Sequence, residues 1–170
     1  WMEDFLLAEA YLEMEKKIAN SSKVVLITGV CGGIGGITAK LFKPKGWTVI
    51  GTDLEERVDV FEKKPYDVFF AADLTLSKIT SKMLFDQISE ITDRLDSLVN
   101  IAAMQDCGDL NELTEECWDR IMSCNLKSPL FLAKAMTPLL LHGEEKGTVI
   151  NVSSVHALQT SDKILTYATS

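Results

Sequence analysis

Residues 23–35 read Lys-Val-Val-Leu-Ile-Thr-Gly-Val-Cys-Gly-Gly-Ile-Gly, and this stretch decides the fold that the rest of the chain must complete. Its first part, Val24–Ile27, is continuously apolar and largely β-branched, which is typical of a strand buried on both faces of a parallel sheet. Glycines follow at once, and residues 37–42 then have a helical pattern. Glycines let a backbone approach a phosphate closely, and a helix N-terminus offers free N–H groups to an anion. The stretch predicts a strand, a phosphate-binding turn and a helix, with a tight turn that binds nothing as the alternative.

Composition and charge exclude several classes of protein. The chain has 170 residues, of which 46% are hydrophobic and 25% charged, as expected for one globular domain with a buried core. The net charge of −8 argues against nucleic acid and against anionic membrane surfaces as partners. No apolar run approaches the ~20 residues that span a bilayer, and the acidic N-terminus is unlike a secretory signal. The four cysteines lack metal-binding spacing, so we expect no metal site, reduced thiols and a cytoplasmic location.

Strand and helix patterns alternate along the chain. The predicted strands are 24–27, 47–51, 66–71, 95–99 and 148–152. The predicted helices are 37–42, 77–93 with Ser77 as a cap, and 115–141. This alternation predicts an α/β fold, a doubly wound parallel sheet with helices on both faces. Residues 1–22 form a predicted amphipathic helical extension, which either docks onto its own domain or contacts another subunit. Residues 23–170 form the predicted nucleotide-binding domain.

The glycine turn carries a resemblance to a known family. Residues 28–35, Thr-Gly-Val-Cys-Gly-Gly-Ile-Gly, resemble the TGxxxGIG fingerprint of the short-chain dehydrogenase/reductase family. The Gly-Lys-Ser/Thr of the alternative phosphate loop is absent. The resemblance implies a Rossmann-like sheet with strand order 3-2-1-4-5, and the C-terminal strands of the family fold are absent from this sequence.

Candidate cofactor residues follow the predicted strands, whose carboxyl ends share one edge of a parallel sheet. Asp53 lies about 20 positions after the glycines, where its carboxylate can accept both ribose hydroxyls and repel a 2′-phosphate. It favours NAD over NADP, with a solvated loop carboxylate as the alternative. In the family, an Asp at the position of Asp73 bonds the adenine amino group, and residues 100–103, Asn-Ile-Ala-Ala, are similar to the NNAG motif with two replacements. The expected cofactor-binding residues are Thr28, Gly29, Gly33, Ile34, Gly35, Asp53, Leu54, Asp73, Leu74, Asn100 and Ala102.

Three further residues match the catalytic positions of the family. Asn125 interrupts an apolar helix four residues before Pro129, and a solvent-facing Asn beside a kink is the alternative. Ser154 and Tyr167 are separated by thirteen positions, the interval between the family's catalytic Ser and Tyr. The resemblance implies that Tyr167 passes the proton, that Ser154 binds the substrate oxygen and that Asn125 anchors a water chain. His156, between them, is expected to be a substrate-loop or structural residue.

The family motif Tyr-x-x-x-Lys has its lysine one position beyond Ser170, the last residue of the sequence. A nearby ammonium lowers the pKa of a tyrosine from its usual value of about 10. We therefore expect residues 1–170 alone to be inactive and to be one piece of a longer polypeptide. The full-length protein is expected to be a homo-oligomer, dimer or tetramer, that interconverts a secondary alcohol and a carbonyl with NAD(H). A non-catalytic nucleotide-binding or subunit-interaction protein on the same fold is the alternative.

Overall fold

Five parallel strands form the centre of the molecule. The structure, a computed structural model, describes residues 23–57, 64–105, 110–142 and 145–170, so the predicted extension at 1–22 lies outside the described residues. The sheet order is β3-β2-β1-β4-β5, and every neighbouring pair is parallel, which confirms the predicted topology. The strands are β1 Lys23–Thr28, β2 Trp47–Asp53, β3 Val68–Ala71, β4 Ser97–Asn100 and β5 Thr148–Asn151.

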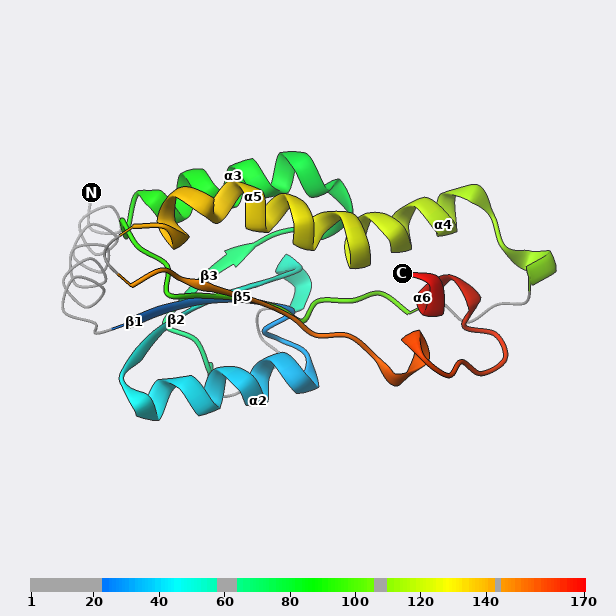
Figure 1. The fold of residues 1–170 in the computed structure, drawn as a ribbon, viewed down its shortest axis with the longest axis horizontal. Coiled ribbons are helices and arrows are strands. Elements are labelled where there is room, and N and C mark those ends of the chain that lie inside the picture. The colour runs from blue at the N-terminus through cyan, green and yellow to red at the C-terminus, as the bar shows by residue number, and fades with distance from the viewer. Residues whose placement is uncertain (1–22, 58–63, 106–109, 143–144) are drawn as a thin grey trace.

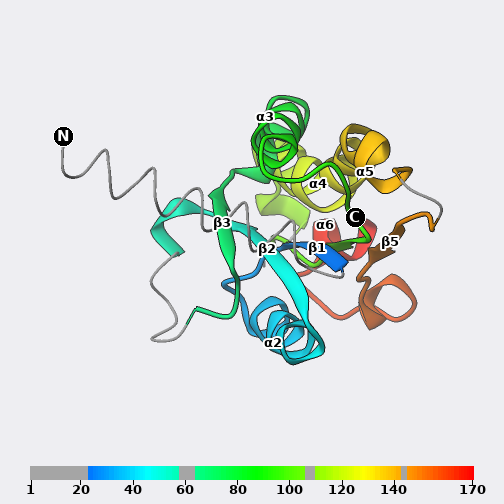
Figure 2. The ribbon, with the colours of Figure 1, turned by 90° about the vertical axis from the view of Figure 1, so that its left-hand side faces the viewer.

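Helices cover both faces of this sheet (Figure 1). On one face lie α3 and α5, and on the other lies α2, as the end-on view also shows (Figure 2). The helices are α2 Gly33–Phe42, α3 Ser77–Ser89, α4 Glu115–Met122, α5 Ser128–Leu140 and α6 Leu165–Thr169. Among the described residues, no helix is both long enough and apolar enough to cross a membrane.

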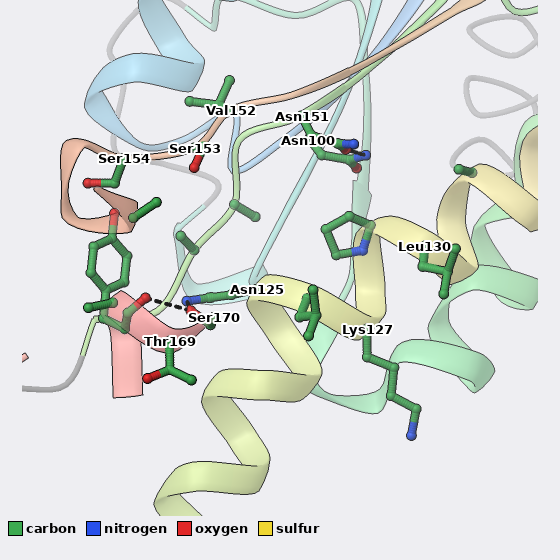
Figure 3. Close-up of a pocket in the computed structure, with 18 residues that line it drawn as sticks. Asn100, Asn125, Lys127, Leu130, Asn151, Val152, Ser153, Ser154, Thr169 and Ser170 are labelled. Atoms are coloured by element: carbon green, nitrogen blue, oxygen red, sulfur yellow. Dashed lines mark hydrogen bonds between the residues drawn. The ribbon is translucent and has the colours of Figure 1, made fainter. Parts of the chain in front are cut away.

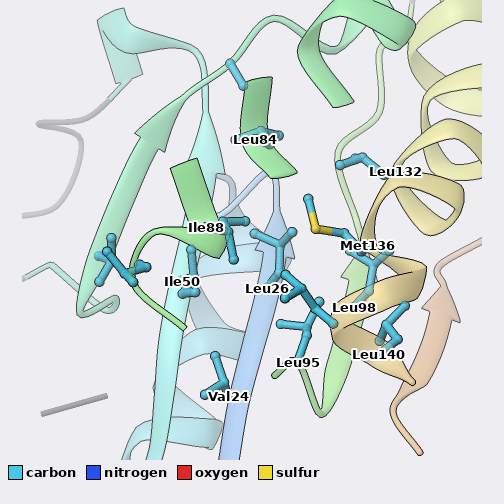
Figure 4. Packing of buried hydrophobic residues seen from close by; sticks show 14 of the residues in the cluster. Val24, Leu26, Ile50, Leu84, Ile88, Leu95, Leu98, Leu132, Met136 and Leu140 are labelled. Carbon is cyan, nitrogen blue, oxygen red and sulfur yellow. The ribbon is translucent and has the colours of Figure 1, made fainter. Parts of the chain in front are cut away.

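The apolar run of β1 is buried on both sides because its residues alternate between two cores. Leu26 points to the side of α3 and α5, where it packs in one cluster with Ile50 and Leu98 from the neighbouring strands (Figure 4). Val25 belongs to the second cluster, on the side of α2. Burial on both faces fixes the register of β1 with its neighbouring strands. The glycines that follow β1 are therefore fixed relative to the ends of those strands.

The predicted helices differ from the observed ones at their ends: α2 begins at Gly33, before residue 37, and α3 ends at Ser89, before residue 93. Ser77 is predicted to cap α3, but the cap residue is Leu76 and no side-chain cap bond forms there. A short 3₁₀ turn, Leu74–Leu76, comes first, and Asp73 caps it by accepting a hydrogen bond from Thr75 N at 2.9 Å. Asp73 thus caps the 3₁₀ turn, because it is the residue that ends the loop after β3. Ser77 is the first residue of α3 and lies inside the helix.

The single helix predicted over 115–141 is in fact two helices joined by a π-helical turn. Thr114 caps α4 through Cys117 N at 3.2 Å. The turn, Ser123–Lys127, closes with a bond from Ser128 N to the Ser123 carbonyl. Pro129 has no N–H to donate to the carbonyl four residues before it, so the regular ladder is interrupted there. The interruption places Asn125 inside the turn.

Candidate active site

Two glycines of the turn are packed against backbone atoms, and a third faces open space. Gly29 has a φ of +67°, and a Cβ on it would lie 2.9 Å from the Cα of Ala102. A Cβ on Gly35 would lie only 2.0 Å from the Gly29 carbonyl oxygen. Around Gly33, by contrast, a Cβ would meet no atom within 4 Å. The turn is therefore packed against its own backbone and against the end of β4, while Gly33 faces open space at the start of α2.

Thr28 holds the end of β4 against this turn. Its hydroxyl accepts hydrogen bonds from Ile101 N at 3.0 Å and from Ala102 N at 3.1 Å. Its side chain is almost completely buried and lies on the wall of neither pocket described below. The sequence predicts that Thr28 contacts a cofactor; the structure places it behind the pocket wall, where it fixes the position of Ala102.

A first cavity, here called the glycine pocket, has a volume of about 310 Å³ and lies at the carboxyl ends of β1, β2 and β3. Of the residues expected to bind a cofactor, it is lined by Gly29, Gly33, Ile34, Gly35, Asp53, Leu54, Asp73, Leu74 and Ala102. The sequence prediction that these residues converge at one edge of the sheet thus agrees with their placement. Asn100, the remaining residue of that set, lines the neighbouring pocket instead.

Asp53 is a buried carboxylate of the glycine pocket that the backbone holds in place. As the last residue of β2, it accepts hydrogen bonds from Cys31 N at 3.0 Å and from Leu54 N at 2.9 Å. Its side chain is 6% exposed, and the guanidinium of Arg57 lies 3.7 Å from Oδ1. Asp73 is exposed, and its Oδ1 accepts bonds from the backbone N–H and the hydroxyl of Thr75. Asp53 is therefore oriented by the backbone on both sides, which a solvated loop carboxylate would not be.

A second and larger cavity, here called the tyrosine pocket, has a volume of about 960 Å³ and is lined by Asn125, Ser154 and Tyr167. Figure 3 shows Asn125 and Ser154 in this pocket. Asn125 comes from the π-helical turn, Ser154 from the segment after β5 and Tyr167 from α6. Ala102 and Ala103 line both pockets, so the two cavities adjoin at the carboxyl end of β4.

The side-chain amide of Asn125 makes three hydrogen bonds. Its Oδ1 accepts a hydrogen bond from Met104 N at 2.8 Å, and its Nδ2 donates to the Met104 carbonyl at 2.9 Å. Nδ2 also donates to Ser170 Oγ at 2.9 Å (Figure 3), and that hydroxyl donates to the Tyr167 carbonyl at 2.9 Å. Because both amide hydrogens are used, the side chain has a single orientation. A water chain that starts at Asn125 would have to begin at its backbone or at Oδ1.

The side chain of Tyr167 packs beside the loop that carries Ser154 and His156. Ser154 Oγ accepts a bond from His156 N at 3.2 Å, and the ring of His156 stands edge-on to that of Tyr167 with 6.1 Å between centroids. Lys127 lines the same pocket, but its side chain points away from Ser154 and Asn125 (Figure 3). Lys127 therefore does not take the place of the lysine that the Tyr-x-x-x-Lys motif requires.

Known proteins share this arrangement of strands and helices. The family model described as short chain dehydrogenase matches residues 23–170. This chain belongs to the short-chain dehydrogenase family. The short chain dehydrogenase andC of Emericella variicolor is 32% identical over 146 residues, which cover 85% of this chain and 58% of that protein. The reductase FabG of Thermotoga maritima, a 3-oxoacyl-(acyl-carrier-protein) reductase, is 32% identical over 156 residues, 87% of this chain and 62% of the relative.

Solved structures show the same likeness. A short chain dehydrogenase of Shigella flexneri, complexed with NADP, matches with a TM-score of 0.76 and 25% identity, over 88% of this chain and 66% of that one. One from Escherichia coli CFT073, complexed with NADPH, matches with a TM-score of 0.75 and 25% identity, over 90% and 67%. The chain thus spans about three fifths of the length of andC and of FabG. Like other short-chain dehydrogenases, it has the fold that holds a nicotinamide dinucleotide.

One buried thiol lies on the wall of the glycine pocket of this short-chain dehydrogenase. Cys124 lines the glycine pocket, and burial together with the charges of Asp73 and Asp53 raises its pKa to about 11. Burial likewise raises the pKa of Cys31, behind the glycine turn. Both thiols are therefore protonated at neutral pH and poor nucleophiles. Among the described residues, no group of three or more His, Cys, Asp or Glu side chains could hold a metal ion.

Several residues of the site are not predicted by the sequence. Met104 acts through its backbone, which leaves no signal in residue type. Ser170 lies three positions after Tyr167, so the two share one side of a helix, yet its bond to Asn125 depends on the fold. The ion pair of Arg57 with Asp53 is also not predicted, because a separation of four indicates an ion pair within a helix and here it joins a strand end to a 3₁₀ turn.

Proposed function

We propose that this chain is the cofactor-binding part of an oxidoreductase that interconverts a secondary alcohol and a carbonyl with NAD(H). The observation that carries the proposal is the junction of the two pockets at Ala102 and Ala103. One pocket has the features of a dinucleotide site, and the other gathers Asn125, Ser154 and Tyr167. Membership of the short-chain dehydrogenase family supports the same reaction class.

The glycine pocket fits the pyrophosphate and adenosine of a nicotinamide dinucleotide. Gly33 leaves open space at the N-terminus of α2, where an anion is favoured by free N–H groups and by the helix dipole. Asp53 would accept the ribose hydroxyls, and Asp73 would meet the adenine. A fixed carboxylate beside the ribose disfavours a 2′-phosphate, so we propose NAD(H) as the tighter-bound cofactor. Two related structures were obtained with NADP and NADPH, so the neighbours themselves do not favour NAD.

The tyrosine pocket would hold the reacting groups. The nicotinamide supplies hydride transfer when it is bound. The Tyr167 hydroxyl would donate a proton to the carbonyl oxygen in reduction and take it back in oxidation. Ser154 would donate a hydrogen bond to the same oxygen as charge develops on it. Asn125, held by the Met104 backbone, would keep the α6 end of the site in position through Ser170.

Further expectations concern the whole protein. We propose that it is a cytoplasmic homo-oligomer that acts on a small-molecule substrate, in keeping with its membership of the short-chain dehydrogenase family. The net charge of −8 supports the expectation that nucleic acid is not a partner. The competing proposal is a nucleotide-binding protein on the same fold that performs no chemistry.

A binding titration and one substitution test the proposal on the full-length protein. NADH bound in such a site should change its nicotinamide fluorescence with saturable behaviour. Tyr167→Phe should abolish turnover of alcohols or ketones and leave the NADH dissociation constant within about twofold, because the hydroxyl lies at the far end from the glycine pocket. NADH binding without turnover in the unmodified protein would favour the non-catalytic alternative. Substantial turnover by Tyr167→Phe would move the proton transfer to another group, with His156 the next candidate.

A further inference from the structure

Three large apolar side chains form an exposed stripe along α2, here called the α2 stripe. Ile34, Ile37 and Leu41 are 63%, 62% and 64% exposed, and intervals of three and four residues place them on one side of the helix. Ala39, which belongs to the core beneath α2, is fully buried. Because α3 and α5 lie on the opposite face of the sheet, they do not cover the stripe (Figures 1 and 2). Single exposed apolar residues are ordinary, but a contiguous stripe indicates a surface that another element covers.

The sequence before β1 contains a matching pattern. Leu7, Tyr11, Met14 and Ile18 recur at intervals of four, three and four residues, in the part of the chain that precedes the described residues. In a helix such positions share one side, as the a and d positions of a heptad do. The last three positions have the same intervals, in the same order, as the α2 stripe. Two parallel helices with these patterns can therefore meet residue for residue.

The predicted extension at 1–22 joins the described chain beside the end of α2. Lys23, the first residue of β1, is paired in register with Trp47, and its Nζ lies 5.7 Å from the centre of the Trp47 ring. The Trp47 ring lies 4.9 Å from the ring of Phe42, the last residue of α2. The extended chain from Ile18 to Lys23 spans up to about 17 Å, whereas the axes of packed helices lie only about 8–10 Å apart. A helix that ends at residue 19 can thus lie along α2, and both helices then run toward the same edge of the sheet.

The charges of the two segments are opposite. Residues 33–45, which form α2 and the 3₁₀ turn after it, contain three lysines and no acidic residue. Residues 1–19 contain five acidic residues and two lysines. Opposite net charges favour the approach of these two segments, and like charges disfavour the pairing of α2 with the α2 of a second copy. The extension of the same chain is therefore a better partner for the stripe than a second α2.

A stripe on α3 has the same spacing but a less suitable position. Leu76, Ile79 and Met83 are exposed there. This stripe lies across the sheet from α2, whereas Lys23 contacts Trp47 on the α2 side. The α3 stripe is thus the competing site that an experiment has to distinguish.

We propose that residues 7–19 form a helix that packs in parallel on the α2 stripe of the same chain. The register pairs the two stripes in order, Tyr11 with Ile34, Met14 with Ile37 and Ile18 with Leu41. Each apolar side chain of the stripe is then removed from water, and the lysines at the end of α2 face an acidic segment. The contact involves no step of the reaction, so the inference stands apart from the proposed function.

Trypsin cleavage after Lys16 and Lys17 measures the packing of this helix in the full-length protein. Trypsin cuts these bonds only in the detached form, so the rate follows the population of that form. Ile37→Glu and Leu41→Glu each place a charge of the same sign as the extension in the apolar contact, and each should raise the rate about tenfold or more. Ile79→Glu is the matched control on α3 and should leave the rate within about twofold. All three positions are exposed in the described structure, so the variants should fold, which circular dichroism checks.

An engineered disulfide tests the register and shows which chain supplies the helix. The double variant Ile18→Cys/Leu41→Cys, treated with oxidised glutathione, should form a disulfide within one chain, because the two positions face each other in the proposed register. The pair Ile18→Cys/Ile79→Cys should not form one. Peptide mapping by mass spectrometry identifies the bonded pair, and a denaturing gel without reductant separates bonds within a chain from bonds between chains.

Faster cleavage in both α2 variants, together with the disulfide from Ile18→Cys to Leu41→Cys within one chain, would support the inference. Equal cleavage rates in the two α2 variants and the unmodified protein, or failure of that disulfide to form, would overturn it. A disulfide from Ile18→Cys to Ile79→Cys would place the helix on α3 and would also overturn it. A disulfide between two chains would assign the stripe to a second copy, which is equally incompatible with docking within one chain. The NADH titration tests the proposed function separately, because Ile37 and Leu41 line neither pocket.

Discussion

Gly33 and Gly35 are two residues apart in one turn, yet their surroundings differ completely. A side chain at Gly35 would collide with backbone, 2.0 Å from the Gly29 carbonyl oxygen, whereas a side chain at Gly33 would enter open space. We expect Gly35→Ala to lower the free energy of unfolding by at least ~2 kcal/mol, because the backbone must move to admit the methyl group. Thermal or urea unfolding of the two single variants is the measurement.

Gly33→Ala is the control for that comparison. It should fold as stably as the unmodified protein, within about 1 kcal/mol, because alanine is favoured over glycine in a helix. If a dinucleotide lies over Gly33, the same substitution should weaken NADH binding without loss of stability. Equal stabilities of the Gly33→Ala and Gly35→Ala variants would contradict the packing described for the turn.

At the scale of elements, Asn125 ties the π-helical turn to the backbone of Met104, in the segment after β4. Asn125→Ala would remove all three hydrogen bonds of the side chain and leave Met104 N–H and carbonyl groups without their partner. We expect a loss of about 2–4 kcal/mol in the free energy of unfolding, since half-buried polar groups lose their bonds. Ser170→Ala removes only one of these bonds and should cost about 1 kcal/mol.

Chemical denaturation of the two variants and of Leu126→Ala checks this order. Leu126 belongs to the same turn but is 59% exposed, so its truncation should change stability by less than about 0.5 kcal/mol. A loss in Leu126→Ala as large as that in Asn125→Ala would mean that the turn, and not the amide, is the sensitive feature.

The sequence predicts the elements well wherever local chemistry decides them. The apolar run of β1 and the glycines after it predict a strand and a turn, because those residue types allow little else. The predicted cap of the segment after β3 is wrong, because Asp73 and Ser77 are both good cap residues and only the fold selects between them. The break at Pro129 is visible in the sequence, but the bonds that Asn125 makes to the Met104 backbone are not. Contacts through backbone atoms leave no trace in residue type.

At the scale of the whole molecule, β5 is an edge strand with apolar side chains in solvent. Val149 and Ile150 are 39% and 43% exposed, and every residue of β5 is exposed. An apolar strand edge with unpaired backbone groups pairs readily with other chains. We expect residues 1–170, expressed alone, to self-associate with rising concentration and to show no turnover. Size-exclusion chromatography with light scattering is the measurement.

A pair of lysine substitutions locates that association. Val149→Lys places a charge on the strand edge and should lower the apparent mass at high concentration. Leu158→Lys changes a side chain that is 94% exposed but lies outside the sheet, and should have little effect. A monodisperse, cooperatively melting protein of residues 1–170 with NADH-dependent activity would refute the prediction and would require a different catalytic arrangement.

Met104 belongs to both halves of the site. It forms part of the glycine pocket, and its peptide groups are the ones that orient Asn125 in the tyrosine pocket. A ligand that restrains the Met104 backbone therefore also restrains Asn125. Through Ser170, the restraint reaches the carbonyl of Tyr167. By thermodynamic linkage, if the first ligand changes the affinity for the second by some factor, the second changes the affinity for the first by the same factor. Communication between the two ligands thus requires no moving domain, because the backbone of one residue, Met104, can transmit it.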